Sequence, residues 1–391
     1  MQSTHLREHN LAAVLTALST AAEPPSRAGL AKTTRLTKPT VSKLVEELID
    51  ARLVTEAAPV SVGSGRPMTP LQPARGTLLA IGVEIAAEHV SCLGIDLAGE
   101  TLAHRVEPTH VTASSADSTI ELVAQLIQRV RDEAGSLPTV GAVIAVPGRI
   151  SPRDGRVLSA PNLDWTDVPL VARLQAHPAL TGLDINALND NRLSVVTEID
   201  QRPGASFLYV RGSTGVGGAV VLDGQILDGV NGWAGELGHT VIEPDGDLCR
   251  CGRRGCLEAY VSFHSLVERA GLGPDVRIED LVDQLSRSSD RTAVIGTIGR
   301  SLGRAIANAL NVLDLTTVVL SGYLAPIAEE IAPVVRETVD AQALAAEIGA
   351  VAIERSDGLA DPALRGAARA ALQPVFSRPG EWIAQEQSTR A

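Results

Sequence analysis

The stretch that decides the fold reads Glu236-Leu237-Gly238-His239, then Cys249-Arg250-Cys251-Gly252-Arg253-Arg254-Gly255-Cys256-Leu257-Glu258. It holds one histidine and three of the four cysteines of the chain. Thiolate and imidazole are ligands that zinc prefers, and three Cys with one His form a standard closed tetrahedral set. Its glycines allow the tight turns that bring closely spaced sulfurs to one ion. The alternative is a disulfide with a spare thiol, which a reducing compartment disfavours.

The spacing E-x-G-H, then C-x-C-G-x-x-G-C-x-E, resembles the signature of the ROK family, which groups repressors, open reading frames and sugar kinases. The resemblance implies a structural Zn²⁺ held by His239, Cys249, Cys251 and Cys256. It also implies a sugar pocket lined by Glu236, His239 and Glu258. One histidine would then orient both the metal and the sugar.

Composition bounds the class of protein. The chain has 391 residues, enough for two or three domains, and 45% of them are hydrophobic. No run approaches the roughly 20 apolar residues of a membrane span, and residues 1–10 have no apolar signal core. We therefore expect a soluble cytoplasmic protein without a membrane partner.

Charge is divided unevenly along the chain. The formal net charge is −12, yet residues 1–75 carry nine Lys and Arg against six Asp and Glu. All three lysines, Lys32, Lys38 and Lys43, lie in this first segment. An acidic body with a basic head suits a protein that touches DNA with one end. Compositional drift in an arginine-favouring genome is the alternative.

The first segment has the pattern of a helix-turn-helix. Leu11, Val14, Leu15 and Leu18 mark one face of a first helix. Ser26 and Thr37 are suitable N-caps for a second and a third helix. The third helix offers Lys38, Thr40, Ser42 and Lys43 to bases or phosphates of DNA. An ordinary helical bundle with a solvated face is the alternative.

A glycine-rich tip, Val62-Gly63-Ser64-Gly65-Arg66-Pro67, follows and resembles the wing of a winged helix, where Arg66 can enter the minor groove. The segments around Ser26–Ala31, Leu36–Ser42 and Gly65–Pro67 are similar to the head of ROK-family transcription regulators.

The body has a β-rich half that occurs twice. Apolar strands are predicted at 79–85, 90–95 and 101–106, then a helix around 120–130 and a strand at 140–146. A similar order begins again at Phe207, and two such halves suggest two lobes around a cleft. This resembles the actin-like ATPase fold of sugar kinases.

Asn189-Asp190 ends a predicted strand and opens a helix. In the ROK family the matching Asp is the general base that takes a proton from a sugar hydroxyl. An amide beside a carboxylate also suits sugar hydroxyls. Helix capping is an equally good explanation of the pair on local sequence, because Asn and Asp are both favoured caps. Asn162, in Pro161-Asn162-Leu163-Asp164-Trp165, resembles part of the family's pocket and is a further candidate.

The nucleotide side departs from the kinases of the family. Where they have Asp-x-Gly-Gly-Thr, this chain has Glu84-Ile85-Ala86-Ala87-Glu88, whose side chains and negative charge oppose a phosphate. The second glycine turn survives in part as Ser213–Gly218, and the adenosine-side Gly-Gly has become Ser321-Gly322-Tyr323. Arg192 replaces the Asn expected in N-D-x-N. We expect no catalytic residue, with Asp190 in the vestigial base position.

The sequence thus predicts an α/β protein: a winged helix-turn-helix at 1–75, then a two-lobed ROK sugar-kinase-like body at 76–373, with lobes at about 76–190 and 191–373. A polar tail at 374–391 should fray. The expected function is a sugar-responsive transcription regulator, a repressor, acting as a homodimer or homotetramer on a palindromic operator. The alternatives are a sugar kinase with a DNA-binding head, supported by Asp190 and the second glycine turn, and a constitutive DNA-binding protein that has lost its ligand.

Overall fold

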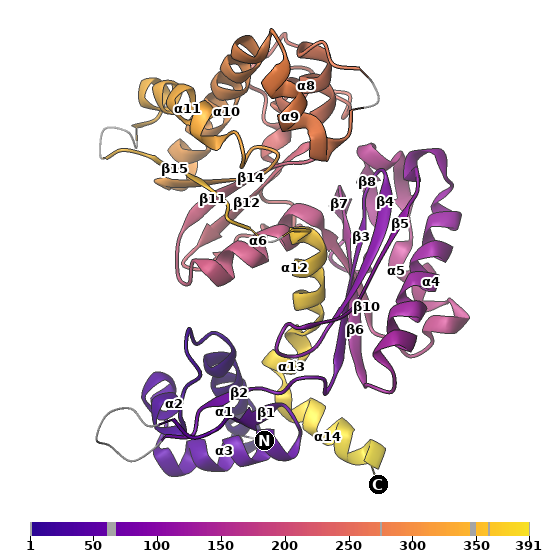
Figure 1. The fold of residues 1–391 in the computed structure, drawn as a ribbon, viewed down its shortest axis with the longest axis vertical. Coiled ribbons are helices and arrows are strands. Elements are labelled where there is room, and N and C mark those ends of the chain that lie inside the picture. The colour runs from indigo at the N-terminus through magenta and orange to yellow at the C-terminus, as the bar shows by residue number, and fades with distance from the viewer. Residues whose placement is uncertain (1, 61–67, 274–275, 345–348, 359, 391) are drawn as a thin grey trace.

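The computed structural model describes residues 2–60, 68–273, 276–344, 349–358 and 360–390. Figure 1 shows a small N-terminal head below two α/β lobes, with the C-terminal helices running from between the lobes down to the head. Both chain termini lie at the head end of the molecule.

The head is a three-helix unit with a β-hairpin. It comprises α1 (Gln2–Ser19), α2 (Arg27–Thr34), α3 (Lys38–Asp50) and the antiparallel strands β1 (Val54–Glu56) and β2 (Leu71–Pro73). The hydroxyls of Ser26 and Thr37 accept the amides of Gly29 and Thr40, which confirms the two predicted N-caps. The predicted apolar faces of α1 and α3 are buried. The predicted wing tip, including Arg66, lies outside the described residues.

The first lobe is built on a five-stranded sheet with the order β10-β6-β3-β4-β5. Strands β3 and β4 and strands β4 and β5 are antiparallel, whereas β6 is parallel to β3 and to β10. The helix α4 (Ala116–Ala134) packs on one face of this sheet and buries its apolar side there. The strands span β3 (Leu79–Ile85), β4 (His89–Ile95), β5 (Thr101–Pro108), β6 (Thr139–Val146) and β10 (Ile185–Asn189).

The second lobe repeats this topology in the order β13-β12-β11-β14-β15, with the same pattern of antiparallel and parallel neighbours. This confirms the prediction that a β-rich half occurs twice. The long helices α10 (Arg291–Leu313) and α11 (Ala328–Gln342) pack together in its core. The strands span β11 (Phe207–Gly212), β12 (Val216–Leu222), β13 (Gln225–Ile226), β14 (Thr317–Gly322) and β15 (Ala352–Arg355).

Shorter elements complete the lobes. The first carries a small sheet of β7 (Arg149–Ile150), β8 (Val157–Ala160) and β9 (Trp165–Val168), followed by α5 (Leu170–Gln175). The second carries α7 (Glu258–Val261), α8 (Phe263–Arg269) and α9 (Leu281–Arg287). Across the described part of the chain, no helix combines the length and the apolar character that crossing a membrane requires.

The C-terminal helices do not follow the predicted lobe boundaries. The helix α12 (Pro362–Ala371) lies against β3 of the first sheet and against α6 (Asp190–Gln201), although residues 191–373 were predicted to form the second lobe. A Cβ at Gly82 of β3 would lie 2.4 Å from the backbone of α12, so this helix sits directly on the strand. The apolar face of α12 explains the difference, because the first sheet offers it a matching apolar surface.

The prediction of a frayed tail at 374–391 is wrong. The segment forms α13 (Gln373–Ser377) and α14 (Pro379–Arg390), which pack against α1 of the head. Val375 and Ile383 are buried in one hydrophobic core with Leu11 and Leu15 of α1. The amide of Gly380 also donates to the Glu8 carboxylate at 2.8 Å. A few well-placed apolar side chains therefore order a segment whose average composition is polar.

Candidate functional site

Four side chains of the second lobe form a compact cluster: His239, Cys249, Cys251 and Cys256, whose ligand atoms all lie within 4.8 Å of one another. The distance from Cys249 Sγ to His239 Nδ1 is 3.8 Å, and the distance from Cys251 Sγ to Cys256 Sγ is also 3.8 Å. Tetrahedral donors at about 2.3 Å from a central ion stand roughly 3.8 Å apart. The cluster therefore has the donor set and the spacing of a tetrahedral metal site.

Local backbone geometry brings these donors together. Cys249 donates its amide to the carbonyl of Arg253, and Gly252 adopts a positive φ of 84° in the intervening turn. Gly255 has a φ of 71°, and a Cβ there would lie 1.6 Å from the carbonyl oxygen of Glu243. Only glycine fits at this position, so the sequence pattern C-G-x-x-G-C fixes the turns that gather the sulfurs.

The thiols of the cluster differ in acidity. Burial raises the pKa of Cys249 and of Cys256. Burial also opposes ionisation of Cys251, but hydrogen bonds, led by the one from the Arg253 amide, lower its pKa. A metal cation would favour the thiolate form of all three sulfurs, because its positive charge would stabilise their negative charges.

A cleft between the lobes holds a cavity of about 530 Å³. Its volume falls within the range of pockets for small ligands, about 300–1,000 Å³. Of the predicted sugar residues, Asn162 and Asp190 line this cavity. Asn162 and Glu258 line a neighbouring one of about 490 Å³, whereas Asn189 and Glu236 line a third, much smaller space. The structure thus places five of the six predicted residues along one cleft but does not join them in a single cavity.

The centre of the cleft is a buried charge cluster that the sequence did not predict. Arg211, on β11 of the second lobe, donates from Nη1 to Asp190 Oδ2 at 3.1 Å, and its Nη2 lies 3.7 Å from Glu84 Oε1 of the first lobe. The exposed fractions of the three side chains are 11% for Arg211, 11% for Glu84 and 7% for Asp190. One guanidinium therefore connects both lobes and is shared by two carboxylates.

Burial raises the pKa of Glu84 and of Asp190, and the positive charge of Arg211 opposes that rise. Burial also disfavours the charge of Arg211, but attraction to Asp190 and Glu84 outweighs it and raises the pKa of the guanidinium. Arg211 Nε is buried and has no hydrogen-bond partner among the described residues.

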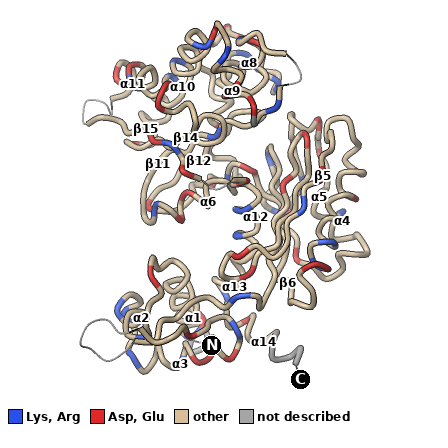
Figure 2. Tube along the Cα trace, viewed as in Figure 1, with Lys and Arg blue, Asp and Glu red and all other residues tan. Residues whose placement is uncertain are grey.

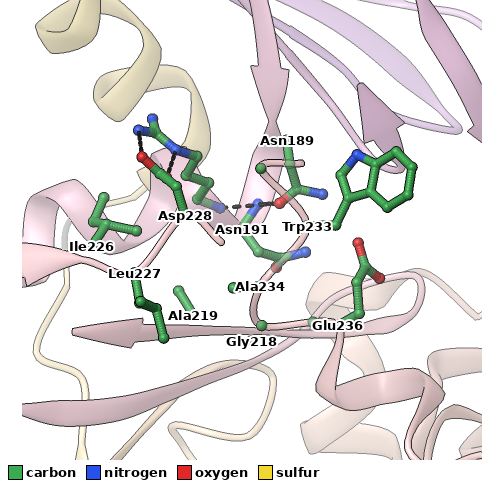
Figure 3. Close-up of a pocket in the computed structure, with 14 residues that line it drawn as sticks. Asn189, Asn191, Gly218, Ala219, Ile226, Leu227, Asp228, Trp233, Ala234 and Glu236 are labelled. Carbon is green, nitrogen blue, oxygen red and sulfur yellow. Dashed lines mark hydrogen bonds and ion pairs between the residues drawn. The ribbon is translucent and has the colours of Figure 1, made fainter. Parts of the chain in front are cut away.

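Asn189 combines a structural contact with a place in the cleft. Its Oδ1 accepts the amides of Asn191 and Arg192, so the residue caps α6, and its Nδ2 donates to the carbonyl of Gly148. Figure 3 shows its side chain beside Trp233 and Glu236. Its capping role is therefore observed, and the position remains compatible with a ligand contact.

Trp233 bridges the two lobes at the edge of the cleft. Its indole Nε1 donates to the carbonyl of Ile150 at 3.3 Å, and the guanidinium of Arg149 lies 5.5 Å from the ring centroid. Arg192 and Asp228 form a two-bond ion pair in the same region (Figure 3). Arg192, where the family pattern has Asn, is thus engaged with the loop that precedes Trp233.

The cleft and the cysteine cluster are connected through Glu258. Its Oε2 accepts the amide of Val216 at 3.1 Å, and its Oε1 lies 3.8 Å from Cys249 Sγ. A Cβ at Gly215 would lie 2.1 Å from Glu258 Oε2, so the glycine turn leaves room for this carboxylate. Partial desolvation raises the pKa of Glu236, with His239 opposing and Asp190 and Glu258 adding to the rise. These side chains therefore share one electrostatic environment.

Residues 80–373 match the sequence profile of the ROK family. The chain belongs to the ROK family. It is 27% identical over 306 residues to the xylose repressor of Bacillus subtilis (strain 168), covering 76% of this chain and 78% of that protein. It is 25% identical over 342 residues to the transcriptional dual regulator NagC of Escherichia coli (strain K12), covering 83% and 82%.

Two solved structures of the ROK family share its fold. A ROK transcriptional regulator, a homologue of the E. coli MLC protein, superposes with a TM-score of 0.78 at 24% identity over 98% of this chain and 99% of that one. A ROK glucokinase from Streptomyces griseus, solved with glucose and AMPPNP, superposes with a TM-score of 0.62 at 22% identity over 75% of this chain and 99% of its own. The predicted fold is confirmed.

Two backbone amides in the segments Glu84–Glu88 and Ser213–Gly218 have partners within the protein. The amide of Ala86, in the first turn, donates to the carbonyl of His89, and Ser213, in the second, donates to the carbonyl of Gly215. The ring of Tyr323 packs on Gly212, where a Cβ would lie 2.6 Å from it. These two amides and the face of Gly212 are therefore engaged in contacts within the protein.

The ROK head presents its third helix to solvent. Lys38 and Lys43 are exposed, Ser42 is half-buried, and Thr40 shares a hydrogen bond of 2.8 Å with the Thr37 hydroxyl. In Figure 2, Lys and Arg positions are marked along the trace of the head near α2. Arg27 is not free for DNA, because it forms ion pairs with Glu46 and Glu56.

Proposed function

We propose that this protein is a sugar-responsive transcription repressor of the ROK family. The observation that carries the proposal is a winged-helix-like head packed, through shared core residues, onto a sugar-kinase-like body. A relative named as a ROK transcriptional regulator matches 98% of this chain, whereas the ROK glucokinase matches 75%. Relatives are named as repressors for xylose and for N-acetylglucosamine.

The proposed DNA contacts are Lys38, Thr40, Ser42 and Lys43 on α3, with Arg66 from the wing. A helix of this length reads one half-site, so a symmetric oligomer would bind a palindromic operator. We propose a homodimer or homotetramer that acts in the cytoplasm, where the bacterial relatives' DNA lies.

The proposed metal is a structural Zn²⁺ held by His239 and the three cysteines, because its preferred donors and spacing fit this cluster. The ion would brace the loop that ends at Glu258. Since Nδ1 of His239 faces Cys249, Nε2 lies on the opposite side of the ring. The proposed sugar contacts are Asn162, Asn189, Asp190, Glu236, His239 and Glu258.

A continuous set of helices supports coupling between the cleft and the head. Asp190 begins α6, and Gly366 of α12 packs so closely on α6 that a Cβ would lie 1.9 Å from the carbonyl of Leu193. The chain runs on from α12 through α13 to α14, which packs on α1. A sugar that binds the two arrangements of the lobes with different affinity would shift the position of the head.

The alternative is a sugar kinase with a DNA-binding head, which Asp190 and the second glycine turn favour. Both oxygens of Asp190 already accept hydrogen bonds, from Arg211 and from Asn191. Each carboxylate oxygen keeps a second lone pair, so these bonds alone do not separate a kinase from a receptor. Sugar-dependent release of ADP from ATP by the full chain would establish the kinase instead.

The proposal is tested by selecting double-stranded DNA from a random library with the full chain and then measuring affinity by fluorescence anisotropy. Adding xylose, glucose or N-acetylglucosamine should change the affinity for the selected DNA. Failure to select any DNA sequence would exclude the repressor function, and selected DNA that responds to none of these or related sugars would exclude the sugar response.

A further inference from the structure

The head and the body are only partly in contact. A groove of about 1,080 Å³ lies between them, and its walls include Thr16 of α1, Val140 of β6 and Leu97 of the turn that joins β4 to β5. Because this groove leaves part of the junction unfilled, the position of the head depends on the chain segments that connect it to the body. The helices α13 and α14 form one connection. The other is the linker 74–78, which joins β2 of the head to β3 of the first lobe.

The linker is short and is held by hydrogen bonds at both ends and in the middle. On the head side, the amide of Ala74 donates to the carbonyl of Leu53 at 2.9 Å. On the body side, the amide of Leu79 donates to the carbonyl of Pro138 at 2.9 Å. Between these two anchors, the amide of Gly76 donates to Asp96 Oδ2 of the first lobe at 2.8 Å. One side chain of the body therefore holds the centre of the linker.

Asp96 is well suited to hold the linker. Its exposed fraction is 1%, and its other oxygen, Oδ1, accepts the amides of Ala98 at 3.0 Å and Glu100 at 2.9 Å. Those two bonds belong to the turn between β4 and β5, whereas the bond to Gly76 reaches a different segment. Hydrogen bonds from amides to an ionised carboxylate are stronger than neutral ones. Gly76 has a φ of 59°, and a Cβ there would meet no atom within 4 Å, so glycine suits this position because of its backbone conformation rather than close packing.

We infer that Asp96 is a positioning residue for the head: by holding Gly76, it sets the orientation of the DNA-binding helix relative to the body. This inference rests on the proposed function, in which a symmetric oligomer binds a palindromic operator. The two heads of such an oligomer must reach two half-sites at a set spacing. A fixed joint raises the effective concentration of the second head at its half-site once the first has bound. Loosening the joint should therefore weaken binding to the whole operator, leave binding to one half-site unchanged and relax the preference for half-site spacing.

Limited digestion of the full chain with trypsin tests the joint without DNA. Arg75 is exposed, and the bond that follows it leads into Gly76. Asp96→Asn replaces one acceptor oxygen with a group that only donates, so the side chain can no longer accept all three amides. We expect cleavage after Arg75 at least about threefold faster, because cleavage follows the population of the open segment. Asp340→Asn, an exposed change on α11, is the control and should have no effect. Unchanged cleavage, or equal acceleration at every site, would mean that Asp96 serves only its own turn and would overturn the inference.

Fluorescence anisotropy with selected double-stranded DNA tests the consequence for operator binding. The three probes are the whole site, one half-site, and the whole site with one or two base pairs inserted at its centre. Asp96→Asn should bind the whole site about tenfold more weakly, bind the half-site like the parent protein, and lose less affinity than the parent when base pairs are inserted.

A second variant separates the linker from the turn. Gly76→Ala leaves Asp96 and its turn bonds in place but strains the linker at a positive φ, so it should change DNA binding in the same direction. Gly135→Ala is the matched control, because Gly135 at the end of α4 has a φ of 74° and equally open surroundings. A ratio of whole-site to half-site affinity that is equal in the parent and both linker variants overturns the inference and leaves the repressor intact. A parent protein that selects no DNA, or only an unrepeated sequence, removes the symmetric repressor and the inference with it.

Discussion

Replacing Arg211 with Met tests the charge cluster that connects the lobes. The variant keeps an elongated side chain but leaves Glu84 and Asp190 buried without their counter-charge. Removing one member of a buried ion pair costs about 3–5 kcal/mol. We expect the lower end, about 3 kcal/mol, because only the 3.1 Å contact to Asp190 has hydrogen-bond length, while the 3.7 Å contact to Glu84 does not.

This loss should depend on pH in a defined direction. Burial already raises the pKa of Glu84 and Asp190 in the folded protein, and removing Arg211 takes away the interaction that opposes the rise. The folded state then binds protons more readily than the unfolded state, so lowering the pH through the raised folded-state pKa values restores stability. The deficit of the variant relative to the parent protein should therefore shrink as the pH falls from about 8 to about 5.5.

Urea unfolding followed by circular dichroism at the two pH values measures the deficit. The double variant Glu84→Gln with Arg211→Met is the control, because it removes one of the two stranded carboxylates and should recover part of the loss. A deficit below about 1 kcal/mol, typical of an exposed pair, would refute the reasoning. So would a deficit that is equal at both pH values.

Three further predictions address the other parts of the molecule. Cys251→Ser should lower the zinc content, measured by atomic emission, and the melting temperature; a variant with neither change would refute a structural metal. Lys43→Ala and Arg66→Ala should each weaken binding to selected DNA and reduce by about one the slope of log binding constant against log salt concentration. Calorimetry should show an unchanged sugar affinity for both variants. Normal DNA binding by both variants would remove the two residues from the interface. Ile383→Ala should lower the free energy of unfolding by about 2–4 kcal/mol and increase proteolysis of the C-terminal helix. The exposed control Glu381→Ala should have little effect. Equal effects of the two substitutions would refute the packing of α14 on the head.

Local sequence patterns predicted the parts of the structure whose causes are local. The caps at Ser26 and Thr37 need only a hydroxyl three residues before a free amide, and the structure has both bonds. The strand at 79–85 is apolar except for Gly82 and Glu84, as expected for a strand buried on both faces, and its bounds are those predicted. The cysteine cluster could also be predicted from local sequence, because glycines a few residues apart determine its turns.

The charge cluster could not be predicted in this way. The local sequence shows only one arginine, Arg211, near the end of the apolar strand Phe207–Gly212. From sequence alone, an arginine at a strand end is expected to face solvent. Its partners, Glu84 and Asp190, come from the other lobe, and only the fold brings them within reach. Whether a charge is stable in the interior depends on the tertiary fold, because the fold determines which counter-charge lies beside it.

The C-terminal helices could not be predicted from local sequence either, because their order depends on apolar contacts with a distant part of the chain. Low average hydrophobicity predicted disorder at 374–391, but order depends on where the few apolar side chains fall rather than on their number. Phe376, Trp382 and Ile383 meet a surface formed by α1, and Gly380 meets Glu8, 372 positions away in the chain. That surface exists only when the head has folded, so no window of the tail sequence contains the information. This contact ties the last helix of the chain to the first, so α13 and α14 connect α12 to the head.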